Sequence, residues 1–141
     1  IGFNLTDIRE QAERMAVRVA KIYGGSPVLN VFDIQDDFRE LPGIKIKDFG
    51  EQTTEEWARF VMNNRNHSFD NIEDILCNQD NKYDIVIGPV ADDNMALLFR
   101  QYENEIIDFE TLLKGMIYKK TSSQYSFHTE KSIKLLRKVG I

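Results

Sequence analysis

Few side chains in this sequence could carry out nucleophilic, acid–base or metal chemistry, and their spacing fits none of the common sites. The chain has one cysteine, Cys77, and two histidines, His67 and His128. A zinc site needs about four ligands at short spacings, and these three are too few and too far apart. A cysteine nucleophile needs a nearby base, and His67 lies ten positions away with no other support. We therefore expect Cys77 to be a buried thiol and His128 to be a structural histidine.

Glycine-based signatures and clustered carboxylates give no clearer indication. The sequence contains no G-x-x-x-x-G-K-[ST] phosphate loop, no G-x-G-x-x-G after a strand and no G-x-S-x-G elbow. Asp92 and Asp93 are adjacent carboxylates, which we interpret as caps of a helix rather than as an acidic site. From the residue types alone, the sequence predicts an α/β or α+β domain and no particular activity.

The elements that must position these side chains follow from periodicity and turn residues. Runs or alternations of β-branched and aromatic residues predict strands at residues 2–6, 28–34, 44–47, 83–90 and 124–129. Apolar residues at helical spacing predict helices at 7–23, 53–64, 92–102, 108–117 and 129–139. The expected N-terminal caps are Asp7 with Glu10, Thr53 with Glu56, Asp92 or Asp93, Asp108, and Thr129.

One connection is unusually long and polar. Residues 63–81 carry a single apolar clump, 72–77, so we expect a loop that holds a short helix. Connections in compact domains are usually shorter, and we expect this one to be mobile.

Size and charge limit the class of protein. A chain of 141 residues is the size of one domain, and it needs no disulfide or metal to be stable. A net charge of −5 gives no basic footprint for nucleic acid, and the basic run 131–138 reads as the solvated face of a terminal helix. No apolar run reaches the length of a membrane span. With one thiol, the sequence favours a soluble protein of a reducing compartment, the cytoplasm.

Three stretches together resemble a family of bacterial proteins placed beside the ADP-ribosyltransferases. They are Gly2-Phe3-Asn4-Leu5-Thr6 followed by Gln11-Ala12, then 83–93 (YDIVIGPVADD), then 124–131 (QYSFHTEK). The resemblance covers nearly the whole chain. It implies an α+β fold of the ADP-ribosyltransferase type, with mixed β-sheets flanked by four to five helices. It also implies a single domain over 1–141 whose first strand, bearing a histidine or arginine, would precede Ile1.

The resemblance implies NAD as the substrate and no metal. Such enzymes break the bond between nicotinamide and ribose, and the ribose gains oxocarbenium character as the ring departs. A glutamate at the start of a late strand offsets that charge, and Gln124 falls at its position. Glu130 is the next carboxylate along the chain and a second catalytic candidate. On one continuous strand it would lie roughly 20 Å from Gln124, so we expect it in the first turn of the last helix, where a negative charge suits the helix dipole.

The same resemblance assigns NAD-binding residues near the start of the chain. Asn4 falls where the family's strand carries a tyrosine that stacks on nicotinamide, with Gly2 and Thr6 in the same strand. Gln11 falls near the side chain that bonds the nicotinamide carboxamide. Met15 falls where a large aromatic is common, although its place on an apolar stripe also suits a helix core.

Three functions follow as alternatives. The first is an ADP-ribosyltransferase or NAD glycohydrolase, a toxin or effector acting on a cellular protein target. The second is a non-catalytic module that binds a nucleotide, or a protein partner through residues 63–81, because Asn4 is not aromatic and Gln124 carries no charge. The third is a structural domain that associates with a neighbouring protein.

Overall fold

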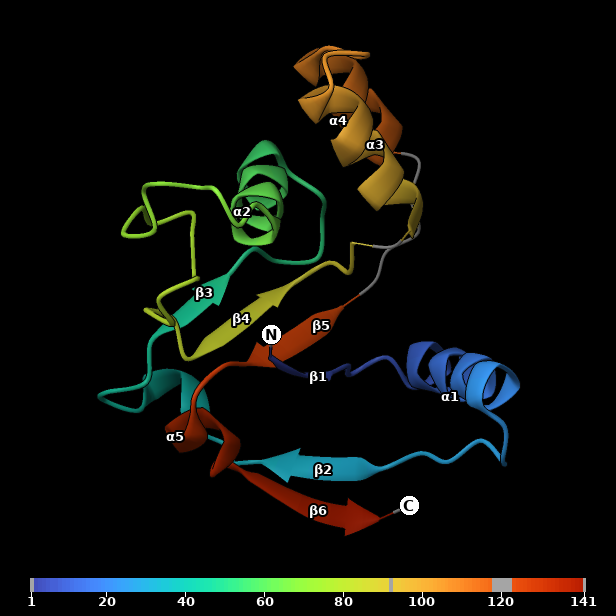
Figure 1. Ribbon diagram of the computed structural model, residues 1–141. Coiled ribbons are helices and arrows are strands. Elements are labelled where there is room, and N and C mark those ends of the chain that lie inside the picture. Colours follow the sequence, from blue (N-terminus) through green and yellow to red (C-terminus); the bar gives the residue numbers. More distant parts are fainter. Residues whose placement is uncertain (1, 92, 118–122, 141) are drawn as a thin grey trace.

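The computed structural model describes residues 2–91, 93–117 and 123–140 (Figure 1). This part of the chain holds five α-helices, one 3-10 helix and six strands in two sheets, which confirms the expected α+β class. The strands are β1 (Phe3–Leu5), β2 (Val31–Ile34), β3 (Ile46–Asp48), β4 (Ile85–Gly88), β5 (Gln124–Phe127) and β6 (Leu136–Gly140). The helices are α1 (Arg9–Tyr23), η1 (Phe38–Glu40, 3-10), α2 (Glu55–Arg65), α3 (Asp93–Glu103), α4 (Phe109–Ile117) and α5 (Glu130–Ile133).

The larger sheet is mixed and brings the two ends of the sequence together. Its strand order is β1-β5-β4-β3, with β3 and β4 parallel and the other neighbours antiparallel. Asn4 of β1 lies opposite Ser126 of β5, and Gly88 of β4 lies opposite Gln124. The smaller sheet is the antiparallel pair β2-β6, on the far side of the larger sheet from α2 (Figure 1).

The described residues form two separate buried cores. Between the two sheets, Ile85, Ile87 and Phe127 pack with Phe38 of η1. The second core joins α2, α3 and α4, and its buried members are Trp57, Ala58, Met62, Met95, Phe99, Leu112 and Met116. A fully buried side chain of this size contributes about 1.5–3 kcal/mol to folding, so these two clusters hold most of the stability.

Helix α1 differs from the other long helices because none of its residues is buried. It lies at the edge of the molecule, beside the loop that leads into β2 (Figure 1). Met15, on the apolar stripe of this helix, is 54% exposed, so its interpretation as helix core is wrong. The stripe lines a hollow instead, because no described element covers it.

Two helix starts differ from the expected caps. The Asp7–Glu10 pair is wrong: Ile8 is the N-cap of α1, without a side-chain hydrogen bond, and the Asp7 carboxylate accepts from the hydroxyl of Tyr125 at 3.3 Å. The cap of α2 lies one residue later than expected, at Thr54, whose Oγ1 accepts from the Trp57 N–H.

The cap of α4 agrees with the sequence, since Asp108 Oδ1 accepts from the Thr111 N–H at 2.8 Å. Of the two carboxylates expected to begin α3, Asp92 lies outside the described residues, and the helix starts at Asp93.

The predicted terminal helix 129–139 is wrong beyond its first turn. Thr129 and Ser132 form a capping box for α5, which ends at Ile133, and the chain continues as β6. Leu135 and Leu136 pack against the core between the sheets while β6 pairs with β2, and this burial and pairing outweigh the helical spacing. The basic run 131–138 therefore spans a short helix and a strand rather than one helix face.

Candidate functional site

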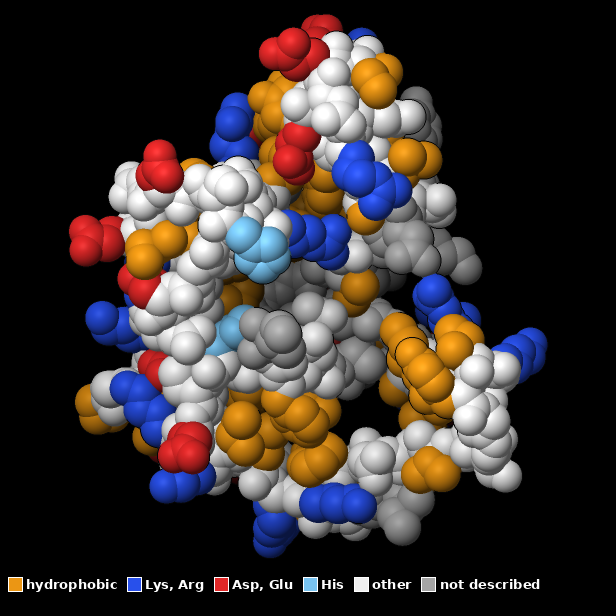
Figure 2. Space-filling model, in the orientation of Figure 1, with side chains coloured by type: hydrophobic (Ala, Val, Ile, Leu, Met, Phe, Trp, Pro, Cys, Tyr) orange, Lys and Arg blue, Asp and Glu red, His pale blue; other side chains and the backbone are white. Residues whose placement is uncertain are grey.

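Two hollows meet at Asn4 and Gln124, and both residues line both of them. The first, here the α2 hollow, has a volume of about 390 Å³ and lies between α2, residues 78–81 and the larger sheet. The second, the α1 hollow, has a volume of about 560 Å³ and lies between α1, β1 and residues 24–32. Figure 2 shows hydrophobic side chains beside the opening on the α1 side. Both volumes lie in the range of about 300–1,000 Å³ that is usual for small-molecule sites.

The junction of the hollows is polar and partly satisfied. Because Asn4 and Ser126 are directly opposite on neighbouring strands, their side chains share one face of the sheet. The Ser126 hydroxyl donates to Asn4 Oδ1 at 2.7 Å, and the Asn4 side-chain N–H groups make no hydrogen bond to another described residue. The half-buried amide of Gln124 makes no hydrogen bond to another described residue. Two amides at the junction can thus bind a ligand.

The α1 hollow is lined without a charged side chain among the described residues. Its α1 wall carries Met15 and a series of small apolar residues, and Thr6 stands at the turn where Oγ1 accepts from the Ile8 N–H at 3.1 Å. Gln11 lines the same wall, but its amide is bonded to the backbone of Ser123. A neutral, partly apolar group suits this hollow.

Gly2 lines neither hollow, but it packs against Ser126 and His128, which line the α2 hollow. A Cβ at this position would come within 2.5 Å of Ser126 Oγ and 2.9 Å of His128 Cε1, so only glycine lets the chain approach these side chains. Burial lowers the pKa of His128, which therefore stays neutral at pH 7. His128 lines the α2 hollow as an uncharged donor and acceptor.

Glu130 stands apart from the other candidates. It is the exposed first residue of α5, as the helix-dipole argument expected, and it lines neither hollow. No Asp or Glu occurs among the described residues that line the two hollows. The structure thus brings together Asn4, Thr6, Gln11, Met15 and Gln124, places Gly2 beneath them, and leaves Glu130 outside.

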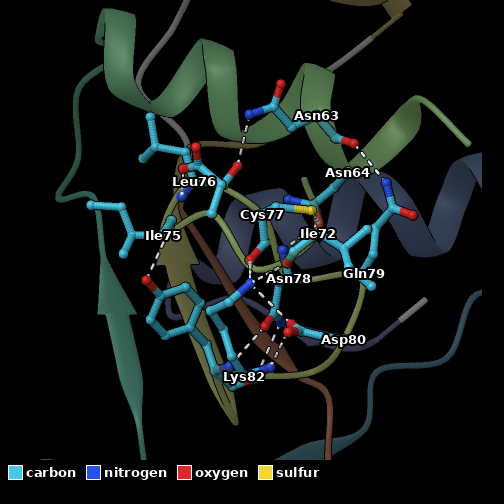
Figure 3. Close-up of polar contacts among 12 residues, drawn as sticks. Asn63, Asn64, Ile72, Ile75, Leu76, Cys77, Asn78, Gln79, Asp80 and Lys82 are labelled. Atoms are coloured by element: carbon cyan, nitrogen blue, oxygen red, sulfur yellow. Dashed lines mark hydrogen bonds and ion pairs between the residues drawn. The ribbon is translucent and has the colours of Figure 1, made fainter. Parts of the chain in front are cut away.

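The outer wall of the α2 hollow comes from the long polar connection after α2, which forms turns and bends rather than the expected short helix. Amide side chains tie it to α2 and to the start of β4 (Figure 3). Asn64 Oδ1 accepts from the Asn78 N–H at 2.7 Å, and the Asn78 amide bonds both backbone groups of Tyr83. Gln79 Nε2 donates to the carbonyls of Asn63 and Asn66. These bonds replace the helix, and they argue against the mobility expected from length.

Sequence reasoning missed the lining residues of this connection. Asn78, Gln79 and Asn81 face the α2 hollow together with Arg65 at the end of α2. The available signal was the density of amide side chains between residues 63 and 81, since amides can replace backbone partners in irregular segments. Cys77 is buried as expected, with its thiol 3.8 Å from Asn64 Oδ1.

The described residues contain no group of three or more His, Cys, Asp or Glu side chains placed to hold a metal ion. Among the same residues, no helix combines the length and apolar character that a membrane crossing requires.

The fold and cleft define a small α+β domain with two sheets and an amide-rich cleft at the edge of the larger one, in which Arg65 is the charged side chain among the described lining residues. The family model described as "Protein of unknown function (DUF3990)" matches residues 1–137, so the chain belongs to this family. No curated protein and no solved structure matches the chain.

Proposed function

We propose that this protein binds NAD where the two hollows meet and cleaves the bond between nicotinamide and ribose, as an ADP-ribosyltransferase or NAD glycohydrolase. The observation that carries the proposal is the convergence at this junction. Asn4, Thr6 and Met15 come from one end of the sequence and Gln124 from the other, and all of them line connected hollows. The resemblance to ADP-ribosyltransferases assigns these same positions to NAD.

The uncharged α1 hollow suits nicotinamide, which leaves the reaction as a neutral ring. In the proposed step, the C–N bond to the ribose breaks and its electron pair passes to the ring nitrogen, which loses its positive charge. Water or a nucleophilic side chain of a protein target then bonds to the ribose carbon and loses a proton. The Gln124 amide oxygen accepts a hydrogen bond from a ribose hydroxyl and so orients the sugar.

An amide gives less help to this step than a carboxylate would. A preorganised group that stabilises developing charge contributes about 2.7–4 kcal/mol, or roughly 10²–10³ in rate. Because the described lining contains no carboxylate, we expect slow turnover. The same observation favours a second candidate function, a module that binds the nucleotide without cleaving it.

The experiment measures nicotinamide release from NAD and, in parallel, NAD binding by calorimetry. Gln124→Glu should raise the release rate by about 10²-fold, because it restores the charge at the junction. Gln52→Glu is the matched control, since Gln52 is exposed, lines neither hollow and gives the same change in net charge.

Each outcome decides between the candidates. Release that rises with Gln124→Glu and not with Gln52→Glu supports the enzyme. Binding without release in either variant supports the nucleotide-binding module. Absence of both binding and release contradicts both NAD-based functions and leaves the protein-partner module.

A further inference from the structure

Helix α1 forms one wall of the proposed NAD site, yet packing does little to hold it in place. It spans 15 residues without one buried side chain. An isolated helix of this length is marginal in water, and helices in proteins owe most of their stability to a packed face. A specific contact must therefore set where α1 lies relative to Gln124.

Gln11 supplies that contact through both ends of its amide. Its Nε2 donates to the carbonyl of Ser123 at 3.0 Å, and its Oε1 accepts from the Ser123 N–H at 3.2 Å. The two residues are 112 positions apart in the sequence, and Ser123 directly precedes Gln124. One side chain thus binds both polar groups of a single residue, as a neighbouring strand would.

A second polar link joins the segment before α1 to β5, and it is weaker in kind. The Tyr125 hydroxyl donates to Asp7 at 3.3 Å, but this bond is exposed and starts from the turn before α1. The Gln11 pair is partly buried, and it starts from the first turn of the helix itself. Because two bonds leave little freedom, they fix both the approach of α1 and the backbone that carries Gln124.

We propose that Gln11 is a positioning residue that holds the Met15-bearing wall of the α1 hollow at a set distance from Gln124. Its consequence for turnover rests on the proposed function, whereas the hold on Ser123 does not. The resemblance places Gln11 near the nicotinamide carboxamide. In the structure the two amide ends are engaged with Ser123, so Gln11 shapes the hollow, and the amide of Gln124 faces the ligand.

The test uses Gln11→Met, which keeps the length of the side chain and removes both hydrogen bonds. Glu13→Met on the same helix is the matched control, because Glu13 is exposed and pairs with Arg9 four residues away. Amide hydrogen exchange reads the backbone at 123–124 without any ligand. We expect exchange of the Ser123 amide to rise about tenfold in Gln11→Met and to stay unchanged in Glu13→Met.

A third variant separates positioning from a general loss of packing. In Gln11→Glu the ionised carboxylate accepts from the Ser123 N–H but cannot donate to its carbonyl, whereas a protonated carboxyl can do both. Exchange at Ser123, corrected for the intrinsic rate, should therefore return toward the wild-type value as the pH falls through about 4.3. Gln11→Met should show no such recovery.

Activity then links the contact to the site. Nicotinamide release should fall about tenfold in kcat in Gln11→Met and match wild type in Glu13→Met. Unchanged exchange at Ser123 in Gln11→Met overturns the proposal whatever the activity. If exchange at Ser123 is faster in Gln11→Met but the wild-type protein neither binds nor cleaves NAD, the Gln11–Ser123 contact is confirmed and the proposed function is refuted.

Discussion

Asp84 is a buried carboxylate that links two segments beside the larger sheet. Asp84 is 3% exposed and directly precedes β4. Oδ2 accepts from the Lys45 N–H at 2.8 Å, and Oδ1 accepts from the Thr129 hydroxyl at 2.7 Å. The Nζ atom of the exposed Lys131 lies 3.7 Å from Asp84 Oδ1. One side chain thus connects the segments before β3 and after β5.

Replacing Asp84 by alanine should lower the free energy of unfolding by about 3 kcal/mol. A hydrogen bond to a charged group contributes about 1.5–3 kcal/mol, and two are lost. The cost stays near the low end of the sum because the Thr129 hydroxyl keeps Ser132 Oγ as an acceptor at 3.2 Å. Asp84→Asn preserves the shape and one acceptor oxygen, so it should cost about 1–2 kcal/mol.

Urea unfolding followed by circular dichroism measures these differences. With a slope of about 1.5 kcal/mol per molar urea, the midpoint of Asp84→Ala should fall by about 2 M. Asp70→Ala is the control, because Asp70 is exposed, and its midpoint should stay close to wild type. A midpoint for Asp84→Ala within about 0.5 M of wild type, or an Asp84→Asn variant that is as unstable as Asp84→Ala, would refute this account of the carboxylate.

Two further predictions concern the walls of the α2 hollow. The Lys82 ammonium donates to two backbone carbonyls of residues 72–77, so Lys82→Met should speed amide exchange there about tenfold, while Lys114→Met, on an exposed pair, should not. Burial lowers the pKa of His128, so the unfolded chain binds its proton first as the pH falls. Stability should therefore drop from about pH 6.5 downward, and less steeply in His128→Gln. The measurement is urea unfolding at each pH, with His67→Gln as the control. An equal dependence of the unfolding free energy on pH in wild type and both variants would contradict the role of His128.

How much of this molecule follows from its sequence depends on whether the signal is local. The continuous apolar run 85–87 predicts a strand, and Ile85 and Ile87 of β4 do pack in the core between the sheets, whereas Val86 on the other face lines the α2 hollow. The prediction of the last helix was wrong because the apolar residues within 134–139 fit the spacing of a helix as well as that of a strand. Their pairing with β2, about a hundred residues away, decides between the two, and no local pattern reports such a partner.

The candidate site shows the same limit. The family resemblance predicts roles for the glycine at position 2 and the amides at 4 and 124, but the contacts of these residues arise from the pairing of β1 with β5. Ser126 on the opposite strand leaves no room for a Cβ at Gly2 and donates to Asn4, and His128, directly after that strand, also restricts position 2 to glycine. The lining from residues 78–81 depends on amide-to-backbone bonds, which have no periodic signature in a sequence.

On the proposed function, the residues that stabilise the fold and those that bind the ligand lie in different parts of this chain. The two buried clusters draw on η1, β4, β5 and helices α2 to α4, whereas α1 contributes no buried residue. An apolar helix face left uncovered costs hydrophobic stabilisation, but it leaves a wall that a neutral ring can contact. A helix that is not fixed by burial must be fixed by directional bonds, and a bidentate amide on the backbone beside Gln124 does this without filling the hollow. The position of Gln11 therefore suits a helix that forms one wall of the α1 hollow without a buried residue.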